Sequence, residues 1–269
     1  MNRTVSIREK WSSLMWPLGV LVMALGLWQA VISWLNIPSY LVPSPQGVVK
    51  AAWLYRQELW GATFQTFSEA VLGYVASVVV GVGAALIMSQ SKIIEKSLYP
   101  YAVILQTIPI VAIAPLIVIW VGAGLKAVVT ISFLIALFPM ISNANFGFIS
   151  TDPGLMTLMR LYGASRWSVT WKLRFPHALP DIFVGMKISA GLAVIGAIVG
   201  EFVAGIGGGR GGLGYVIIQA ATQMQIALLF AAALASSLLG IAIFLTVSGL
   251  STRFVGHWHA SSVVRPGEQ

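Results

Sequence analysis

The chain contains no cysteine, only three histidines and few charged residues. The lack of cysteine excludes disulfide bonds and thiol chemistry. Charged residues make up 9% of the chain, whereas soluble domains average about 25%. Hydrophobic residues make up 58%, and the mean hydropathy is +0.87. This composition predicts an integral membrane protein, so the net charge of +8 indicates basic loops rather than a nucleic-acid partner.

Catalytic motifs are missing as well. The sequence has neither a His-Glu-x-x-His nor a Gly-x-Ser-x-Gly motif. The glycine-rich run at residues 205–215 lacks the Gly-Lys-Ser/Thr ending of a phosphate-binding loop. We therefore expect no catalytic residue, no metal site and no cofactor bound by this chain. A membrane enzyme, which needs a polar cluster at one membrane face, stays a minor alternative.

Long apolar runs predict six membrane-spanning helices. A helix needs about 20 apolar residues to cross a bilayer. The runs are continuous, whereas the strands of a membrane barrel alternate apolar and polar residues. The expected fold class is therefore an all-α integral membrane protein with a single transmembrane domain over residues 1–269. The predicted spans cover residues 14–35, 70–91, 98–121, 127–149, 181–204 and 226–250, and a short surface helix is expected at residues 46–60.

Basic residues are distributed unevenly between the two sides that six spans define. Of the 16 Lys and Arg residues, only Lys50, Arg56, Lys126 and Arg210 fall in segments on one side. By the positive-inside rule, the side that carries the others is cytoplasmic. This orientation predicts that both chain ends and the segment at residues 152–180 lie in the cytoplasm.

Prolines interrupt two of the predicted spans. Pro109 and Pro115 lie in the third span and Pro139 in the fourth. A proline removes a backbone hydrogen bond and kinks a helix, and such breaks are tolerated in membranes where they line a cavity. We therefore expect a mobile pair of helices beside a cavity, although membrane helices also contain prolines of no further consequence.

A few polar residues inside the spans are candidates for a transport pathway or a gate. An ionisable residue in the bilayer is costly and is a functional hypothesis by default, which singles out Glu201. Glu201 can instead pair with Arg210 or with a helix N-terminus, and each neutral side chain can bond to a neighbouring helix. The candidate pathway and gating residues are Gln106, Thr107, Pro109, Asn143 and Glu201.

Small residues are dense in the second and fifth predicted spans. Gly73 and Gly81 are examples in the second, and Gly196 and Gly200 in the fifth. Such residues let helices approach closely. We expect these faces to pack tightly, either within the chain or against a second copy.

The segment at residues 152–180 is basic and is punctuated by glycine and proline. A connection of about two to eight residues would suffice to turn the chain, so its length indicates a surface that is presented to a partner in water. Gly163 permits a positive φ between two short helices. Pro176 and Pro180 are expected to end helical structure before the fifth span.

The same segment resembles the cytoplasmic loop of ABC-importer permeases. In that loop Glu-Ala-Ala is followed after three residues by Gly and, after nine more, by Ile-x-Leu-Pro. Here Gly163 is followed after nine residues by Leu173–Pro176, but Thr157–Met159 stands where the Glu-Ala-Ala triplet would. Two further stretches, Leu41–Pro45 and Gly212–Tyr215, resemble the nitrate, sulfonate and taurine branch, which includes permeases for thiamine pyrimidine precursors.

The resemblance implies the fold of a type I ABC-importer permease, with a cytoplasmic coupling helix between the fourth and fifth spans. Arg and Trp are enriched in interface hot spots, which agrees with a docking role for this helix. The implied residues that dock the ATPase are Arg160, Gly163, Ala164, Ser165, Arg166, Trp167, Phe175 and Pro176.

The resemblance also implies partners and a location. A homodimer of the permease in the bacterial inner membrane is expected to bind a dimer of cytoplasmic ATPase subunits, which hold ATP and Mg. A solute-binding protein outside the cytoplasm delivers a small solute, either a sulfonate-, taurine- or nitrate-like anion or a small heterocycle. An ATP-independent carrier or channel is the alternative; a carrier predicts inverted repeats, and no convincing one is evident.

Overall fold

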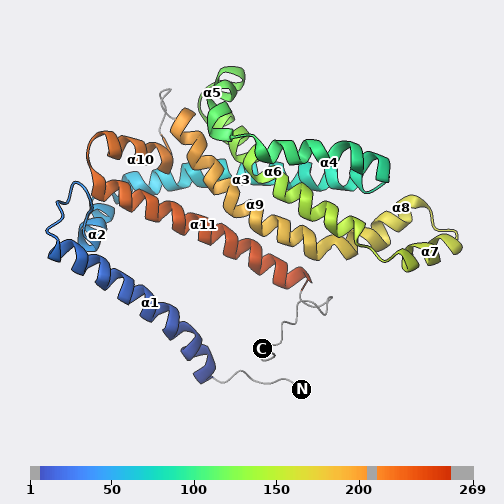
Figure 1. Cartoon of the computed structure of the whole chain (residues 1–269), viewed down its shortest axis with the longest axis horizontal. Coiled ribbons are helices and arrows are strands. Elements are labelled where there is room, and N and C mark those ends of the chain that lie inside the picture. The colour runs from blue at the N-terminus through green and yellow to red at the C-terminus, as the bar shows by residue number, and fades with distance from the viewer. Residues whose placement is uncertain (1–6, 205–210, 256–269) are drawn as a thin grey trace.

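The computed structural model describes residues 7–204 and 211–255, which are almost entirely helical and include no strand (Figure 1). Arg210 and both chain ends, which entered the predictions above, lie outside the described residues. The helices are α1 (Ile7–Trp34), α2 (Pro45–Leu54), α3 (Arg56–Met88), α4 (Lys92–Thr107), α5 (Ile110–Val121), α6 (Leu125–Ile149), α7 (Pro153–Leu161), α8 (Arg166–Val169), the π-helical turn η1 (Thr170–Arg174), α9 (Phe175–Ala204), α10 (Leu213–Thr222) and α11 (Ile226–Val255).

The helices confirm an all-α fold with six candidate spans. α1, α3, α6, α9 and α11 are each long and apolar enough to cross a membrane, and the sharply bent pair of α4 and α5 makes a sixth candidate if the two helices form one broken span. The surface helix expected at residues 46–60 ends at Leu54, and α3 begins at Arg56, well before residue 70. The polar stretch from Arg56 to Glu69 contains no proline, so no helix breaker separates it from the apolar residues that follow.

Of Pro109, Pro115 and Pro139, only Pro109 coincides with a break in the helix. α4 and α5 meet at Ile108 and Pro109 with a bend of 99°. Pro115 lies inside α5 and Pro139 inside α6, and both helices continue through these positions. Each of these prolines lacks a backbone N–H, but the helix axis changes direction sharply only at Pro109, where Ile108 adopts an extended conformation.

Helical structure also continues through Pro176 and Pro180, so the expectation that these prolines end it was wrong. Pro176 occupies the first turn of α9, and directly before it the N–H of Phe175 bonds to the carbonyl oxygen of Thr170 in the wide turn η1. A π-helical turn accommodates such an irregularity within a continuous helix. As a consequence, residues 166–204 form one rod that joins the charged segment to the fifth span.

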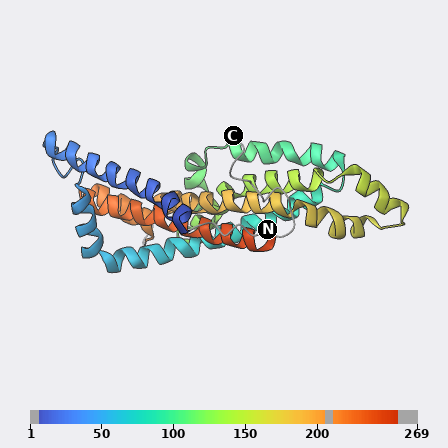
Figure 2. The ribbon, with the colours of Figure 1, turned by 90° about the horizontal axis from the view of Figure 1, so that it is seen from below.

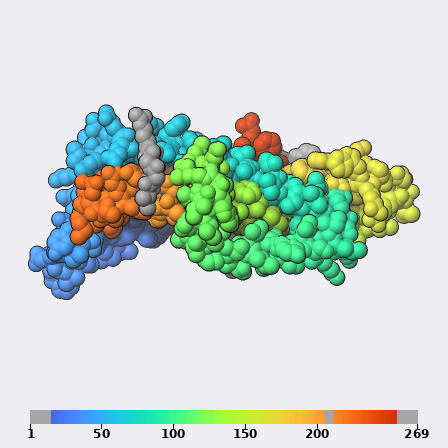
Figure 3. All heavy atoms as spheres, turned by 90° about the horizontal axis from the view of Figure 1, so that it is seen from above, coloured from blue at the N-terminus to red at the C-terminus, as the bar shows by residue number. Residues whose placement is uncertain are grey.

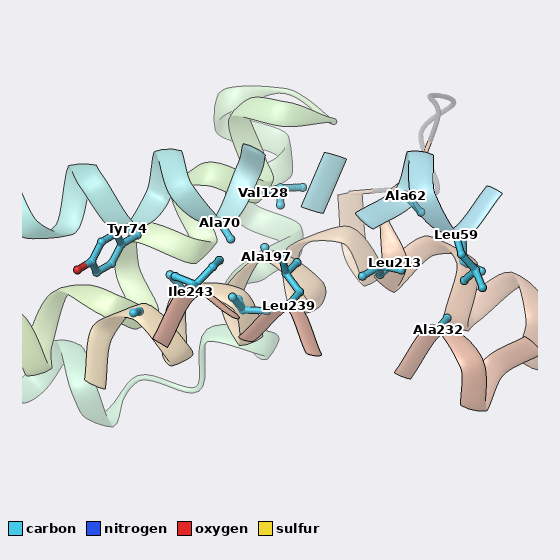
Figure 4. Close-up of a cluster of buried hydrophobic side chains, with 14 of the residues drawn as sticks. Leu59, Ala62, Ala70, Tyr74, Val128, Ala197, Leu213, Ala232, Leu239 and Ile243 are labelled. Carbon is cyan, nitrogen blue, oxygen red and sulfur yellow. The ribbon is translucent and has the colours of Figure 1, made fainter. Parts of the chain in front are cut away.

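The core centres on α3, α6 and α9, which approach one another closely at small residues (Figure 1). α10 and α11 add larger side chains to it, among them Leu213, Leu239 and Ile243 (Figure 4). The Ser132 hydroxyl of α6 donates to the carbonyl oxygen of Ala193 at 2.8 Å, and the Ser189 hydroxyl of α9 donates to that of Ala136 at 2.8 Å. A Cβ at Gly196 would lie 2.6 Å from the Cα of Ser132. Gly73, Gly81, Gly196 and Gly200 therefore pack against α6 within the chain, whereas nothing lies within 4 Å of a Cβ built at Gly83 or Gly191.

Two parts of the molecule lie outside this core. α7 and α8 project at one end, as Figures 1, 2 and 3 show from three directions. α1 diverges from the bundle, and the apolar residues of its span are not buried. Its contact with the bundle includes Trp28, whose ring centroid lies 5.9 Å from that of Phe230 in α11.

Candidate functional site

Two helix N-caps and one glycine turn fix the backbone of the projecting segment, which comprises residues 153–174. Asp152 caps α7, because its Oδ1 accepts from the N–H of Gly154 at 2.6 Å. α7 ends at Leu161, and Gly163 two residues later has φ +75. The N–H of Gly163 bonds to the Arg160 carbonyl and the N–H of Ala164 to the Met159 carbonyl, both at 3.0 Å. This is the Schellman arrangement, and it favours glycine at the left-handed position. The predicted positive φ at Gly163 is present.

The turn after Gly163 starts a second short helix. Ser165 caps α8 by accepting from the N–H of Ser168 at 3.2 Å. Arg160, Arg166 and Trp167 are exposed, and α7 has no buried residue. The segment therefore has a fixed backbone and a surface that no other described part of the chain covers.

A row of aromatic rings runs from this surface into the core. Trp167, Trp171 and Phe175 follow one another at helical spacing, with ring centroids 5.5 Å and 5.1 Å apart. Phe175 lies 6.1 Å from Phe148 of α6, which is fully buried. Trp167 is 66% exposed. Movement of the exposed Trp167 ring would therefore push, through Trp171 and Phe175, against the closely packed interior.

Three guanidinium groups line one cavity beside the projecting segment, which we call the arginine cavity. Arg160, Arg166 and Arg174 line it together with Gln90 and Ser91 at the turn between α3 and α4, and its volume is about 550 Å³. No acidic side chain lines it. Like charges in one cavity repel, and an anionic group would relieve this repulsion.

Arg174 also ties the segment to the bundle. Its Nη1 donates to the carbonyl oxygen of Ser89 at the end of α3, at 2.6 Å, and its Nη2 lies 3.4 Å from the sulfur of Met156 in α7. The sequence analysis did not select Arg174 as a site residue. The sequence could have indicated it, because Arg174 is a basic residue inside the Leu173–Pro176 motif.

A second cavity, the membrane cavity, lies at the bend between α4 and α5. It has a volume of about 390 Å³. Apolar side chains of α4, α5, α6 and α9 form most of its wall. Its polar lining comes from Gln106, Ser142 and Asn143, and no charged side chain contributes.

The predicted pathway residues divide between this cavity and other places. Gln106 and Asn143 line it together, although they are distant in the sequence. Pro109 sets the bend beside it, whereas the Thr107 hydroxyl bonds to the carbonyl of Ile104 and does not line it. Ser142 was missed; its hydroxyl lies 3.3 Å from that of Tyr99 in α4.

Glu201 lies in a separate site, the carboxyl centre, at the end of the bundle opposite the projecting segment. Glu201 Oε1 accepts from the Thr66 hydroxyl, and Oε2 accepts from the N–H of Gly214, both at 2.6 Å. The N–H of Leu213 donates to Thr66 Oγ1 at 2.8 Å. The helix N-terminus that the sequence offered as a partner of Glu201 is therefore that of α10.

Glu69 completes the carboxyl centre, and the sequence analysis did not pair it with Glu201. The two carboxyl groups lie within hydrogen-bond reach of each other. The Gln65 amide donates to Glu69 Oε1 at 3.2 Å. Glu69 is 1% exposed and Glu201 2%. The spacing of Gln65, Thr66 and Glu69 within one helical turn was a signal, but their partner lies far along the chain.

Fold and sites define the class of protein: a helical membrane subunit with an exposed projecting segment, a cavity at the bend between α4 and α5 and, among residues 7–204 and 211–255, no group of side chains that could hold a metal ion. The chain belongs to the family described as "Binding-protein-dependent transport system inner membrane component", whose profile matches residues 77–261. It is thus a permease subunit of an ABC importer rather than an enzyme, and such importers also contain an ATPase and a solute-binding protein.

Individual relatives agree with this assignment. The chain is 35% identical over 239 residues to a probable ABC transporter permease of Haemophilus influenzae, covering 89% of this chain and 96% of that protein. It is 33% identical to the riboflavin transport permease RibX of Chloroflexus aurantiacus, with 94% and 93% covered. It is 32% identical to the formylaminopyrimidine transport permease ThiX of Halalkalibacterium halodurans, with 85% and 90% covered.

Solved structures support the fold. The inward-facing MetNI methionine ABC transporter includes a chain that superposes with a TM-score of 0.58 at 18% identity, covering 72% of this chain and 97% of that one. A chain of an amino acid ABC transporter with histidines superposes with a TM-score of 0.55, covering 76% and 95%. The predicted type I importer fold is therefore confirmed.

Proposed function

We propose that the projecting segment is the coupling element of this importer and that it docks the cytoplasmic ATPase. The observation that carries the proposal is the continuous rod from α8 through η1 into α9, which begins at the exposed segment and ends in the carboxyl centre. A force applied to the segment acts directly on a transmembrane helix. The exposed α7 and α8 supply the surface.

The chemistry of that surface fits an acidic partner. The arginine cavity collects three cations without a carboxylate in its lining. Arginine forms bidentate bonds with carboxylates. We therefore infer that an acidic side chain of the ATPase enters this cavity beside Trp167. The departure at Thr157–Met159 fits the same picture, since the neutral Thr157 stands in the place of the family's Glu and leaves Arg160 without a carboxylate at that position.

We also propose that two copies of the chain enclose the pathway, with α7 and α8 in the cytoplasm. The membrane cavity opens at the surface of a single chain, because Gln106 in its lining is exposed. Closed two-fold symmetry is the commonest arrangement of identical subunits. The basic residues of the projecting segment support its cytoplasmic location.

The lining of the membrane cavity favours a small heterocycle as the solute. Amides and a hydroxyl both donate and accept hydrogen bonds, which suits ring nitrogens and carbonyl groups. No cation lies in the lining to hold a sulfonate. The relatives named for riboflavin and formylaminopyrimidine are 33% and 32% identical to this chain, whereas those named for aliphatic sulfonates are 28% and 29% identical. A sulfonate or taurine-like anion is the second candidate.

The docking proposal is tested at Gly163. Nothing lies within 4 Å of a Cβ built there, so a substitution acts through its positive φ alone. Gly163→Val should cost about 1–2 kcal/mol locally and weaken copurification with the ATPase. Gly163→Asn is the matched control, because asparagine tolerates this conformation.

The assay is performed on the complex reconstituted with its ATPase and binding protein. Uptake and stimulated ATP hydrolysis should fall for Gly163→Val and stay near the wild-type level for Gly163→Asn. Wild-type copurification and coupling in the valine variant would contradict the docking role. Uptake of formylaminopyrimidine, riboflavin and taurine in the same vesicles ranks the solutes, and preferred uptake of taurine would reject the heterocycle.

A further inference from the structure

The carboxyl centre has two carboxyl groups but too few donors for two negative charges. Glu201 accepts two hydrogen bonds, from a hydroxyl and from a backbone N–H. Glu69 accepts one, from the Gln65 amide, and its Oε2 is buried with no donor. Two ionised carboxylates at hydrogen-bond distance in a buried site repel strongly, and sharing a proton removes this repulsion. Among residues 7–204 and 211–255 no further donor reaches the two carboxyl groups, so the geometry points to a shared proton.

Neighbouring charges do not replace that proton in the described part of the chain. Along the helices that pack here, the other titratable side chains are Arg56, Glu58 and Tyr74 on α3, Lys126 on α6, His177, Asp181 and Lys187 on α9, and Tyr215 on α10. None of them bonds to the pair, and the charge that acts on Glu201 is that of Glu69.

We propose that Glu69 and Glu201 bind one proton between them, and that this protonated pair fastens the N-terminus of α10 to α3 and α9. The donor count assigns the charge. Glu201 remains ionised, since it faces two donors at a helix N-terminus, where negative charge is favoured. Glu69 carries the proton and donates it to Glu201, which satisfies both carboxyl groups.

The packing of α10 depends on this arrangement. A Cβ at Gly212 would overlap Glu201 Oε1 and Thr66 Oγ1, so the backbone lies directly on the pair. A Cβ at Gly214 would lie 2.6 Å from the carbonyl oxygen of Ile198 in α9. Loss of the proton gives Glu69 a negative charge next to that of Glu201, beside the N-terminus of α10. We expect α10 then to separate from α3 and α9.

The proton exchanges with the outer side of the membrane in this account. A cavity of about 770 Å³ lies between α3 and α10, and Gln65 lines it together with Glu58 and Tyr215. Gln65 is one hydrogen bond from Glu69. Alkaline conditions outside the cell therefore release α10, and acidic conditions keep it fastened.

Amide hydrogen exchange of Leu213 and Gly214 tests the proposal in the assembled importer. In the wild type, protection corrected for the pH dependence of intrinsic exchange should fall about tenfold or more between pH 6 and pH 10. Glu69→Gln keeps a donor and removes the titration, so its protection should stay high throughout. Glu58→Gln, an acid in the same cavity but outside the pair, should follow the wild type.

Infrared spectroscopy provides a second measurement that does not depend on exchange. The wild type should show a protonated carboxyl band at pH 7 that Glu69→Gln lacks. Constant protection in the wild type, or a wild-type transition in Glu69→Gln, would overturn the proposal. So would loss of the transition in Arg210→Gln, which would identify Arg210 as the partner in place of a proton. If Gly163→Val does not uncouple transport but the wild type still loses amide protection as the pH rises, the docking proposal fails and the proposal of a shared proton stands.

Discussion

At one end of the molecule α10 is fastened by hydrogen bonds to buried side chains, whereas at the other end α7 and α8 expose nearly all of theirs. α9 connects the two ends: Glu201 lies near its end, and Phe175 begins it. At the buried end, both carboxylate oxygens of Glu201 accept hydrogen bonds from other parts of the chain. The exposed end has a backbone fixed by helix caps, but no other described part of the chain covers most of its side chains. A subunit that transmits motion from another subunit needs this difference, because only an exposed surface is available to bind that subunit.

The largest effect is expected where both ends depend on the α6–α9 contact. Gly196→Val would place side-chain atoms against the Ser132 backbone, and overpacking costs about 1–3 kcal/mol. We expect a lower unfolding temperature in detergent and little assembled complex. Gly191→Val on the same helix is the control, since nothing lies within 4 Å of its Cβ. Equal stability of the two variants would contradict the packing described here.

The next effect concerns the buried end alone. Glu201→Ala leaves the Gly214 N–H and the Thr66 hydroxyl without their acceptor, at a cost of about 1–3 kcal/mol. Thermal unfolding should shift downward, and proteolysis should increase near residue 212. Glu58→Ala removes an exposed acid from the same helix and should leave both unchanged. If the two variants behave alike, Glu201 does not fasten α10.

A smaller effect on stability and a specific effect on coupling are expected at the exposed end. Trp171→Ala removes the ring between Trp167 and Phe175, and each aromatic pair contributes about 0.5–1.5 kcal/mol. The complex should assemble, while stimulation of ATP hydrolysis by the binding protein and uptake should fall together. Trp34→Ala, which removes a ring that is 85% exposed, is the control. Full coupling in Trp171→Ala would show that the row transmits no motion.

The same asymmetry explains what the sequence could predict. Apolar runs located the five long candidate spans and the bent α4–α5 pair, because crossing a bilayer demands length and hydrophobicity. The positive φ of Gly163 was predictable because the capping of α7 is local. The bend at Pro109 was predictable for the same reason.

Contacts between distant parts of the chain could not be predicted. The partnership of Glu201 with Glu69 and Thr66 depends on how α3 and α9 pack. The path through Pro176 depends on a π-helical turn, which no residue type signals. The small residues allowed packing within the chain or between copies, and only the three-dimensional arrangement shows that Gly196 and Gly200 pack against α6 while Gly191 is open.

The central claim, that the projecting segment docks the ATPase, is tested most directly with a single introduced cysteine. The chain has no cysteine of its own, so Trp167→Cys provides one unique thiol at a position that is 66% exposed. Tyr40→Cys, 57% exposed in the loop before α2, is the control. A membrane-impermeant maleimide is applied to inside-out vesicles with and without the ATPase subunit. The account predicts rapid labelling at position 167 that the ATPase blocks, and no labelling at position 40 in either case. Equal labelling at position 167 with and without the ATPase would contradict it.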